Sequence, residues 1–237
     1  MSRIPDDRRV PDVHNRKMAR LYAPDERDHL YPVSAVLRQS ARRRRAWWAE
    51  GWHGDQGWTP HCVAFSWAHW LADGPRTVSI MPGRRPGVDT TELYCEAQRR
   101  DPWPGDCDTP LYEGTSVRAG AKTLQEWGFI KEYRWARSLD EIVQAVLTQG
   151  PVVMGTPWYE DMFFPDKDGM IRRGGAWAGG HAYLVNGVDL DRGLARIKNS
   201  WGRGWGINSH AYLTLEDLGL LLGSFGEACV PIQQRRT

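Results

Sequence analysis

A chain of 237 residues, of which 41% are hydrophobic and 13 are tryptophan, is long enough to bury a sizeable core. This composition excludes disorder of the chain as a whole. The formal net charge is only +2, so the overall charge does not require a nucleic-acid or membrane partner. Any such partner has to be argued from a local segment.

The first thirty residues are rich in charged side chains and contain no apolar run. They predict neither a signal peptide nor a transmembrane helix, and we expect a cytoplasmic protein. The 26 arginines against 5 lysines indicate a GC-rich genome, bacterial or phage, and a phage-encoded protein would be associated with the virion. Four cysteines are too few for a disulfide framework. Whether Cys95 and Cys107 form a disulfide stays open, because nothing in the sequence requires that bond.

Positive charge is concentrated near the N-terminus, where residues 1–50 hold 12 basic and 7 acidic side chains. We interpret residues 1–46 as a basic arm that precedes the main domain. Near its end lies a run of four arginines, which is most simply a solvated charged edge. The alternatives are a processing site or a surface for nucleic acid or another anionic partner. The four residues are Arg42, Arg43, Arg44 and Arg45.

Residues 47–150 are predicted to be mainly helical. In the stretch around Cys62, Thr59 is a candidate cap, Pro60 suits the first helical position and Gly74 provides a stop. The residues between are apolar nearly all round, so we expect a buried helix with Cys62 in its first turn.

Further start and stop signals follow along the chain. Capping patterns at Asp89 and Ser138 each predict a helix, and a third helix is expected to end at Gly128. Residues 151–232 instead contain short runs of β-branched and aromatic residues separated by turn signals, which predicts an antiparallel sheet or barrel. The expected fold class is therefore α+β, a helical half followed by a β half, with residues 233–237 as a tail.

Cys62 occupies a position that favours reactivity. The first turn of a helix favours a thiolate, because the helix dipole and the unpaired amide protons place positive potential there. Taken alone, a cysteine in an apolar helix is more often a buried structural residue. A nearby base is needed to favour the catalytic interpretation.

His181 and Asn199 supply candidate partners. His181 follows two glycines at the start of a predicted strand, a rim position from which a side chain can reach across a cleft. Asn199 comes 18 residues later, at the end of the next predicted strand, so a hairpin would bring it beside His181. An amide oxygen that accepts from an imidazole fixes its tautomer and ring angle.

Three sequence elements together resemble the papain family of cysteine peptidases. Gln56 lies six residues before Cys62 in DQGWTPHCVAFSW, His181 stands in GGHA, and Asn199 begins NSWG in KNSWGRGWG. The order and spacing match that family, in which the histidine and asparagine follow the cysteine at a distance of well over one hundred residues. The resemblance covers about residues 46–232.

This resemblance implies a two-lobe papain-like fold with the active site in the cleft between the lobes. Cys62 would be the nucleophile on the helical lobe, and the β lobe would carry His181 as general base and acid and Asn199 to orient it. Gln56 would donate to the oxyanion. Trp201 would shield the histidine–asparagine pair, and Gly180 and His61 are counted with Trp201 as residues that bind substrate or shape the site. No metal and no cofactor are expected, and the partner is a protein or peptide substrate.

The chain departs from the family pattern around the nucleophile. Thr59 stands where the family usually has a disulfide-bonded cysteine, which agrees with a reducing compartment, and Val63 replaces an aromatic residue. His61 is most simply a surface residue, since neighbouring helical positions do not face each other. The arm is shorter than the family's inhibitory prosegments and lacks their motif, which argues against classical zymogen control. It would either occupy the cleft or bind a partner.

Three functions remain open. The leading one is cysteine peptidase action through an acyl-enzyme at Cys62. An amidase or transamidase would use the same residues, because only the group that resolves the acyl-enzyme differs. The altered sequence around Cys62 also leaves room for a catalytically inactive binding or structural protein.

Overall fold

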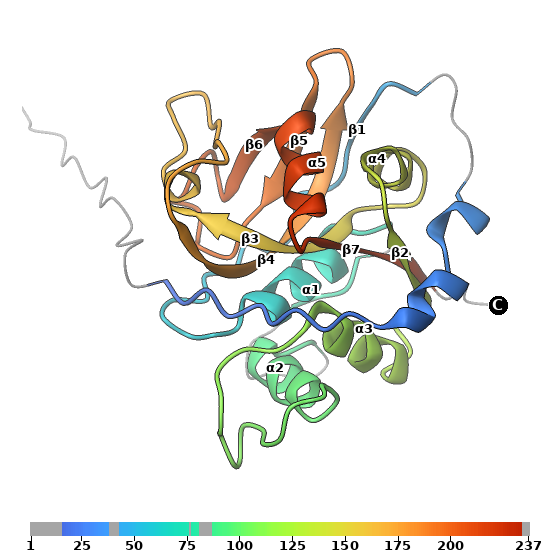
Figure 1. Cartoon of the computed structure of the whole chain (residues 1–237), viewed down its shortest axis with the longest axis vertical. Coiled ribbons are helices and arrows are strands. Elements are labelled where there is room, and N and C mark those ends of the chain that lie inside the picture. Colours follow the sequence, from blue (N-terminus) through green and yellow to red (C-terminus); the bar gives the residue numbers. More distant parts are fainter. Residues whose placement is uncertain (1–15, 38–42, 76, 81–86, 234–237) are drawn as a thin grey trace, which may run out of the picture.

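The computed structural model describes residues 16–37, 43–75, 77–80 and 87–233 of the chain (Figure 1). Its centre is an antiparallel sheet with the strand order β2-β7-β3-β4-β5-β6, and β1 pairs with β4 beside this path. The strands are β1 (Arg45–Trp47), β2 (Ile130–Ala136), β3 (Val152–Tyr159), β4 (Trp177–Asp189), β5 (Leu194–Lys198), β6 (His210–Thr214) and β7 (Glu227–Gln233).

Local sequence signals account for the ends of several helices. Asp89 accepts from the amides of Thr91 and Glu92, and Ser116 and Ser138 cap the following helices through their hydroxyls, as short polar side chains do at this position. The α-helices are α1 (Cys62–Asp73), α2 (Thr90–Gln98), α3 (Val117–Glu126), α4 (Leu139–Thr148) and α5 (Leu215–Gly223). Short 3-10 helices are η2 (Glu26–Leu30), η3 (Val33–Ala35) and η4 (Glu160–Phe163).

Two hydrophobic clusters lie on either side of the sheet. One joins α1, α2 and α3 to residues such as Val153 and Leu184, and the other joins α4 and α5 to the opposite strand faces. α1 is buried at every position, because it is enclosed by α2, α3 and the sheet. The predicted α+β class with a helical lobe and a β lobe is confirmed.

The structure also differs from the sequence-based prediction in several elements. α1 begins at Cys62 with His61 as its N-cap, and the Thr59 hydroxyl donates to the Gln56 carbonyl instead of capping the helix. Strand β2 lies within the predicted helical half, and α4 packs with the β lobe. Helix α5 lies within the predicted β half. Pairing with the distant β7 determines β2, and such a long-range contact leaves no local signal.

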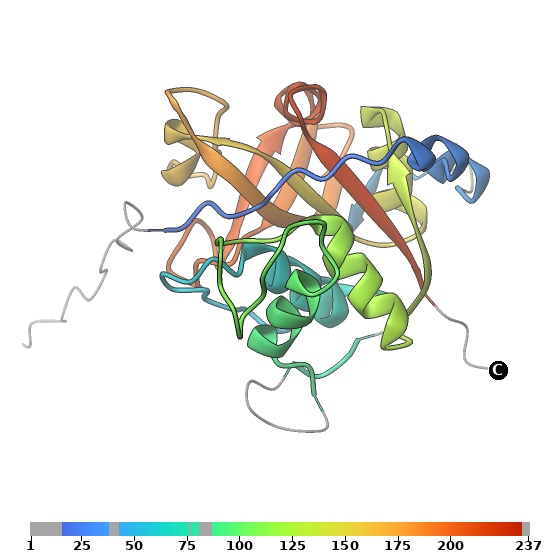
Figure 2. The same ribbon diagram turned by 60° about the horizontal axis from the view of Figure 1, so that its bottom comes forward.

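The N-terminal segment crosses the molecule between the two lobes. In Figures 1 and 2 it runs from the first described residues along the boundary between the sheet and helices α1 to α3. Further on, β1 adds residues 45–47 to the edge of β4, so the end of the predicted arm is part of the sheet. Within the described residues, no helix has the length and apolar character needed to cross a bilayer.

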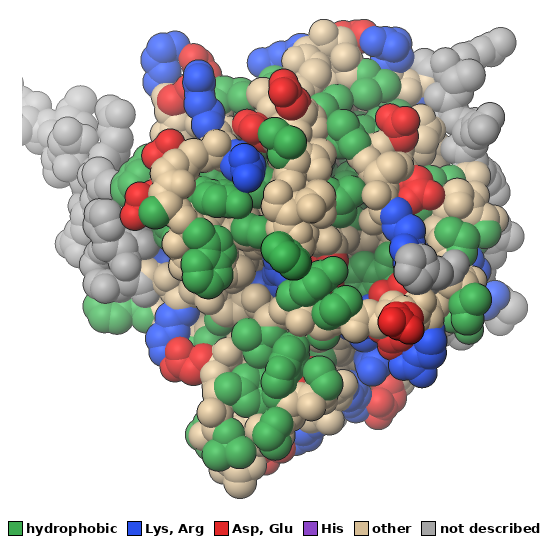
Figure 3. All heavy atoms as spheres, in the orientation of Figure 1, with side chains coloured by type: hydrophobic (Ala, Val, Ile, Leu, Met, Phe, Trp, Pro, Cys, Tyr) green, Lys and Arg blue, Asp and Glu red, His purple; other side chains and the backbone are tan. Residues whose placement is uncertain are grey.

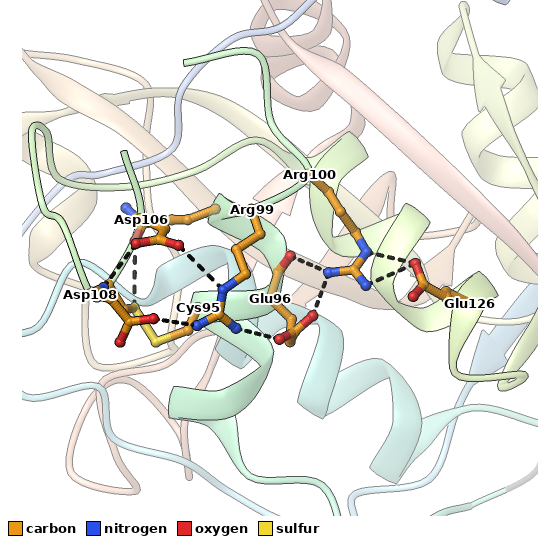
Figure 4. A network of polar contacts seen from close by, with 9 residues as sticks. Cys95, Glu96, Arg99, Arg100, Asp106, Asp108 and Glu126 are labelled. Carbon is orange, nitrogen blue, oxygen red and sulfur yellow. Dashed lines mark hydrogen bonds and ion pairs between the residues drawn. A yellow bond between two sulfur atoms is a disulfide. The ribbon is translucent and has the colours of Figure 1, made fainter. Parts of the chain in front are cut away.

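A disulfide joins Cys95 in α2 to Cys107 in the loop that follows. This resolves the pairing that the sequence left open. Figure 4 shows that ion pairs reinforce the same loop: Arg99 contacts Asp106 and Asp108, while Arg100 links Glu96 to Glu126. The disulfide and these charges hold the segment that leads to the wall of the cleft at residues 113–115.

Candidate active site

Cys62 is the first residue of α1, and its side chain is fully buried. The backbone amides of Val63 and Ala182 donate to its sulfur. Ala182 follows His181 in β4, so the second of these contacts brings the thiol of the helical lobe against the strand that carries the candidate base. The packing of α1 against β4 therefore sets the position of Cys62.

His181 is held by Asn199 across the β4–β5 pair. Its Nε2 donates to Asn199 Oδ1 at 2.8 Å, because an amide oxygen is only an acceptor. Its Nδ1 is buried and has no hydrogen-bond partner within the described part of the chain. Burial is the main cause that lowers the pKa of His181 to about 4, so the ring is neutral. A neutral ring with a proton on Nε2 presents the Nδ1 lone pair as a base.

Ser200 links the asparagine to the glutamine, and sequence reasoning missed it. Its backbone amide donates to Asn199 Oδ1 at 2.8 Å, and its hydroxyl donates to Gln56 Oε1. Its carbonyl accepts from the Gln56 backbone amide at 2.8 Å. One buried serine thus orients both amide side chains. Its position directly after Asn199 is the only sequence signal that could have identified it.

The side-chain amide of Gln56 faces the cleft. Its Nε2 donates to the Thr59 carbonyl at 2.8 Å and, more weakly, to the Lys17 carbonyl of the N-terminal segment at 3.4 Å. This donor is therefore aimed at two peptide carbonyls, one of which belongs to the N-terminal segment.

Two tryptophan rings pack against the His181 ring. The Trp201 ring lies 5.0 Å from the His181 ring, and the Trp158 ring lies 4.8 Å from it, both as centroid distances. Trp201 also stacks on Phe163 and is almost fully buried. This cluster keeps water from the hydrogen bond between His181 and Asn199.

Residues 17–22, here called the cleft segment, fill the cleft above Cys62. The Arg20 amide donates to the Gly180 carbonyl at 2.8 Å on the β lobe, and the Leu21 amide donates to the Thr115 carbonyl at 3.0 Å on the helical lobe. The Ala19 amide donates to the Cys62 sulfur. The segment therefore bonds to both walls of the cleft and to Cys62.

Two glycines make room for this backbone. A Cβ at Gly114 would lie 2.1 Å from the Ala19 carbonyl oxygen, and one at Gly180 would lie 2.2 Å from the Arg20 carbonyl oxygen. Such distances are impossible for real side chains, so the channel is shaped for an extended peptide backbone. Figure 3 shows hydrophobic side chains gathered on this face, beside the path of the segment in Figure 1.

The cleft segment changes the electrostatics of Cys62. Burial raises the pKa of its thiol, and this effect exceeds the opposing effects of the backbone hydrogen bonds and of the nearby Arg20 charge. In this covered arrangement burial opposes the thiolate that the first turn of a helix favours. The physical reason is that covering the thiol removes the water that would solvate its charge.

His61 and the described part of the arginine run contact residues other than Cys62. The His61 ring stacks on Tyr94 with centroids 4.1 Å apart, and the Tyr94 hydroxyl accepts from the Gly114 amide, so His61 supports the cleft wall indirectly. Arg44 pairs with Asp191, and Arg45 approaches Asp189 at 3.9 Å. Arg43 donates to the Leu147 carbonyl, and Arg42 lies outside the described residues.

No protein-family model matches the chain. Cathepsin B-like cysteine proteinase 3 of Ostertagia ostertagi is 31% identical over 121 residues, which cover 47% of this chain and 69% of that protein. Cathepsin B-like cysteine proteinase 6 of Caenorhabditis elegans is 29% identical over 151 residues, or 60% of this chain. The match spans only 40% of the length of this second relative.

The fold is also found among solved structures. Xylellain, a cysteine protease from Xylella fastidiosa, superposes with a TM-score of 0.65 at 18% identity, covering 93% of this chain and 98% of that one. Together with the identity to the Ostertagia ostertagi proteinase, this means that the chain belongs to the cathepsin B-like, papain-fold family of cysteine peptidases.

Proposed function

We propose that this protein hydrolyses peptide bonds, with Cys62 as nucleophile, His181 as base and acid, and Asn199 as the residue that orients the ring. The observation that carries the proposal is the hydrogen bond from His181 Nε2 to Asn199, which leaves Nδ1 unpaired beside the strand residue that contacts the Cys62 sulfur. Membership in the cathepsin B-like family supports the same reaction.

In the proposed reaction the thiol proton moves to His181 Nδ1 while the sulfur attacks the carbonyl carbon. The tetrahedral intermediate collapses as the C–N bond breaks, and His181 returns the proton to the departing amine. Water then attacks the thioester, with His181 accepting its proton, and the acid product leaves as the thiol is restored. Because Gln56 and the Cys62 backbone amide would donate to the oxyanion, each is expected to contribute about 3 kcal/mol to stabilising the transition state.

With the cleft segment in place, the protein is in a latent form. It covers Cys62 completely, and its Lys17 carbonyl takes the Gln56 amide that a substrate would need. Displacement of residues 17–22 is therefore a requirement for turnover. We include this in the proposal: the arm acts by occupying the cleft, whereas binding of nucleic acid or another anion by Arg42 to Arg45 stays a prediction.

The test is to compare two cysteine variants of the full chain on a mixed peptide library. Cys62→Ala is expected to abolish cleavage, because no other thiol faces His181. Cys229→Ala is the matched control, since Cys229 is the other buried free cysteine and lies in β7 away from the cleft. Its cleavage rate is expected to stay within about threefold of that of the unchanged protein, because removal of this buried group lowers the free energy of unfolding and does not alter the cleft.

The results separate the open functions. Undiminished cleavage by Cys62→Ala would exclude the assignment. Products that carry an added amine in place of water would instead identify a transamidase. If an epoxide-type thiol probe fails to label Cys62 after the cleft segment has been displaced, the chain is an inactive member of the family.

The location of the protein is part of the proposal as well. The cytoplasmic prediction, or a virion location for a phage protein, rests on the charged N-terminus, whereas the disulfide between Cys95 and Cys107 favours an oxidising compartment. We propose an oxidising compartment, because the disulfide that holds the loop next to the cleft wall persists only where thiols are not kept reduced. Mass spectrometry of thiol-blocked protein from its native source checks this: free Cys95 and Cys107 would exclude it.

A further inference from the structure

The loop that carries Gln56 is fastened to helix α1, which begins at the proposed nucleophile. Two side chains one turn apart on the same face of α1 hold the backbone of this loop. Asp73 Oδ1 accepts from the Gly51 amide at 2.8 Å, and His69 Nε2 accepts from the Gly54 amide at 3.1 Å. Gly54 lies only two residues before Gln56, so the second bond holds the proposed oxyanion donor close to its place along the helix.

Gly54 also joins the two lobes through its backbone. Its amide bonds to His69, while its carbonyl accepts from the Gly202 amide at 3.1 Å on the loop between β5 and β6. A Cβ at Gly54 would lie 2.6 Å from Phe65 Cδ1 and closer still to the Trp52 ring. Because any larger residue would push the loop away from α1, glycine is needed here for the amide to reach the histidine.

The hydrogen bond to Gly54 requires one particular form of the histidine. A backbone amide only donates, so Nε2 of His69 carries no proton and the ring proton is on Nδ1. Nδ1 is buried and has no hydrogen-bond partner among the residues whose positions the structure describes. Burial also lowers the pKa of His69 well below its usual value, which keeps the accepting nitrogen unprotonated. An unpaired buried N–H is destabilising, so stability alone does not explain a histidine at this position.

Gln56 is held from the β lobe as well. The Ser200 carbonyl accepts from the Gln56 backbone amide, and the Ser200 hydroxyl donates to Gln56 Oε1. These contacts set Gln56 relative to Asn199 and the proposed base. The bond between His69 and Gly54 instead sets the loop relative to α1 and the proposed nucleophile. An oxyanion forms on the carbon that the nucleophile attacks, so its donor has to be placed relative to α1.

We propose that His69 is a positioning residue of the peptidase: its Nε2 holds the Gly54 amide and thereby keeps Gln56 in place to stabilise the oxyanion. The inference rests on the proposed peptidase function and adds a residue to the groups that support it. His69 is fully buried, so it reaches no substrate and acts only through the backbone between Gly54 and Gln56. Small displacements of a group that acts on the transition state lower the rate steeply.

Two variants of the full chain separate the accepting nitrogen from the bulk of the ring. His69→Gln keeps an acceptor that can reach the Gly54 amide, while His69→Phe keeps a ring without an acceptor. Both are made in a Leu21→Pro background, in which the cleft segment lacks one hydrogen bond. Because the cleft segment competes with substrate, its displacement changes KM, and kcat reports on the transition state. We expect kcat to fall about tenfold in His69→Phe and to stay within about threefold of the background protein in His69→Gln.

A double-mutant cycle shows whether His69 acts through Gln56. In a Gln56→Ala protein, His69→Phe is expected to change kcat less than about twofold, because the group that it displaces is already absent. An unchanged kcat in His69→Phe with Gln56 present would overturn the inference, and so would equal losses in His69→Phe and His69→Gln. A full tenfold loss in the Gln56→Ala protein would also overturn it. Circular dichroism verifies folding, and His69→Leu, with the same expected loss, replaces His69→Phe if that variant does not fold.

Amide hydrogen exchange separates this inference from the proposed function. It is followed by nuclear magnetic resonance on the full chain with Cys62→Ala, which needs no turnover. Exchange of the Gly54 amide is expected to be at least about tenfold faster in His69→Phe than in His69→Gln, since only the first variant lacks an acceptor. That result supports the hold of His69 on the loop even if no peptide is ever cleaved. Equal exchange rates overturn it, even if the enzyme hydrolyses peptides.

Discussion

At the scale of single residues, the site depends on side chains that orient other side chains. Asn199 Oδ1 accepts from both His181 Nε2 and the Ser200 amide, so two donors determine which way its oxygen points. The Ser200 hydroxyl in turn holds Gln56. Asn199 is expected to act on the base and Ser200 on the oxyanion donor, although they are neighbours in the chain.

Removal of either side chain should lower kcat more than it raises KM, because both orient groups that act on the transition state. Asn199→Ala is expected to reduce kcat about 100-fold, by analogy with other residues that fix a catalytic imidazole. Ser200→Ala loses one hydrogen bond and should cost about 3- to 10-fold. Steady-state kinetics on a protein with a displaced cleft segment measures both.

Ser209→Ala is the control for these two variants. Its hydroxyl is buried and has no hydrogen-bond partner within the described residues, so kcat should not change. An effect of Ser200→Ala confined to KM would contradict a role in orienting Gln56.

At the scale of elements, the cleft segment is held mainly through its backbone. It bonds to β4 at Gly180 and to Thr115, two residues before α3, and its side chains add the contacts of Arg20 and the ion pair between Lys17 and Glu113. Because the backbone holds the cleft segment, the loss of one amide hydrogen bond weakens its attachment. Such a change leaves every residue outside 17–22 as it is.

Leu21→Pro removes the amide that donates to the Thr115 carbonyl. Loss of one hydrogen bond, worth about 1 kcal/mol, should increase the exposed fraction of Cys62 by about fivefold. The rate of Cys62 alkylation by iodoacetamide reports this directly. Leu21→Ala keeps the amide and is the matched control; equal alkylation rates for the two variants would show that the backbone bond does not hold the segment.

At the scale of the whole molecule, buried polar groups join the two lobes. Lys198 of β5 contacts both oxygens of Asp73 at the end of α1, at 2.7 and 2.9 Å, and neither side chain is exposed. His53, His69 and His210 lie near this pair, and burial keeps these three and two histidines elsewhere in the fold neutral. The pKa values of His53, His61, His181 and His210 are lowered to about 4, and burial lowers the pKa of His69 well below its usual value.

The free energy of unfolding should therefore fall as the pH decreases from about 6.5 to 4. In that interval the unfolded chain binds more protons than the native chain at these five histidines, so acid favours unfolding, on the order of 1 kcal/mol or more for each deeply buried ring. Glu227, whose pKa burial raises to about 7, acts in the opposite direction but is a single group. Urea unfolding of Cys62→Ala at several pH values measures the balance.

His69→Gln tests the origin of the acid sensitivity. His69 Nε2 accepts from the Gly54 amide, and a glutamine oxygen can do the same without a titrating proton. The variant should show a shallower loss of stability in acid. An unchanged dependence of the unfolding free energy on pH would mean that groups other than His69 cause the acid sensitivity.

The sequence by itself determined the candidate cysteine, histidine and asparagine and the order of a helical half before a β half. Those features are written in local motifs, capping residues and periodicity, which short stretches of chain can carry. Strand β2, helix α5 and the start of α1 were misjudged, because packing against distant segments decides them.

Only the tertiary structure decided what lies in the cleft. Arg20 and Phe225 are 205 residues apart, and no local pattern around either one indicates that they meet. The same is true of the serine that joins Gln56 to Asn199 and of the cleft segment that buries Cys62. Contacts between distant residues depend on how the lobes close on each other, so the candidate nucleophile could be identified from the sequence, while its covered state could not.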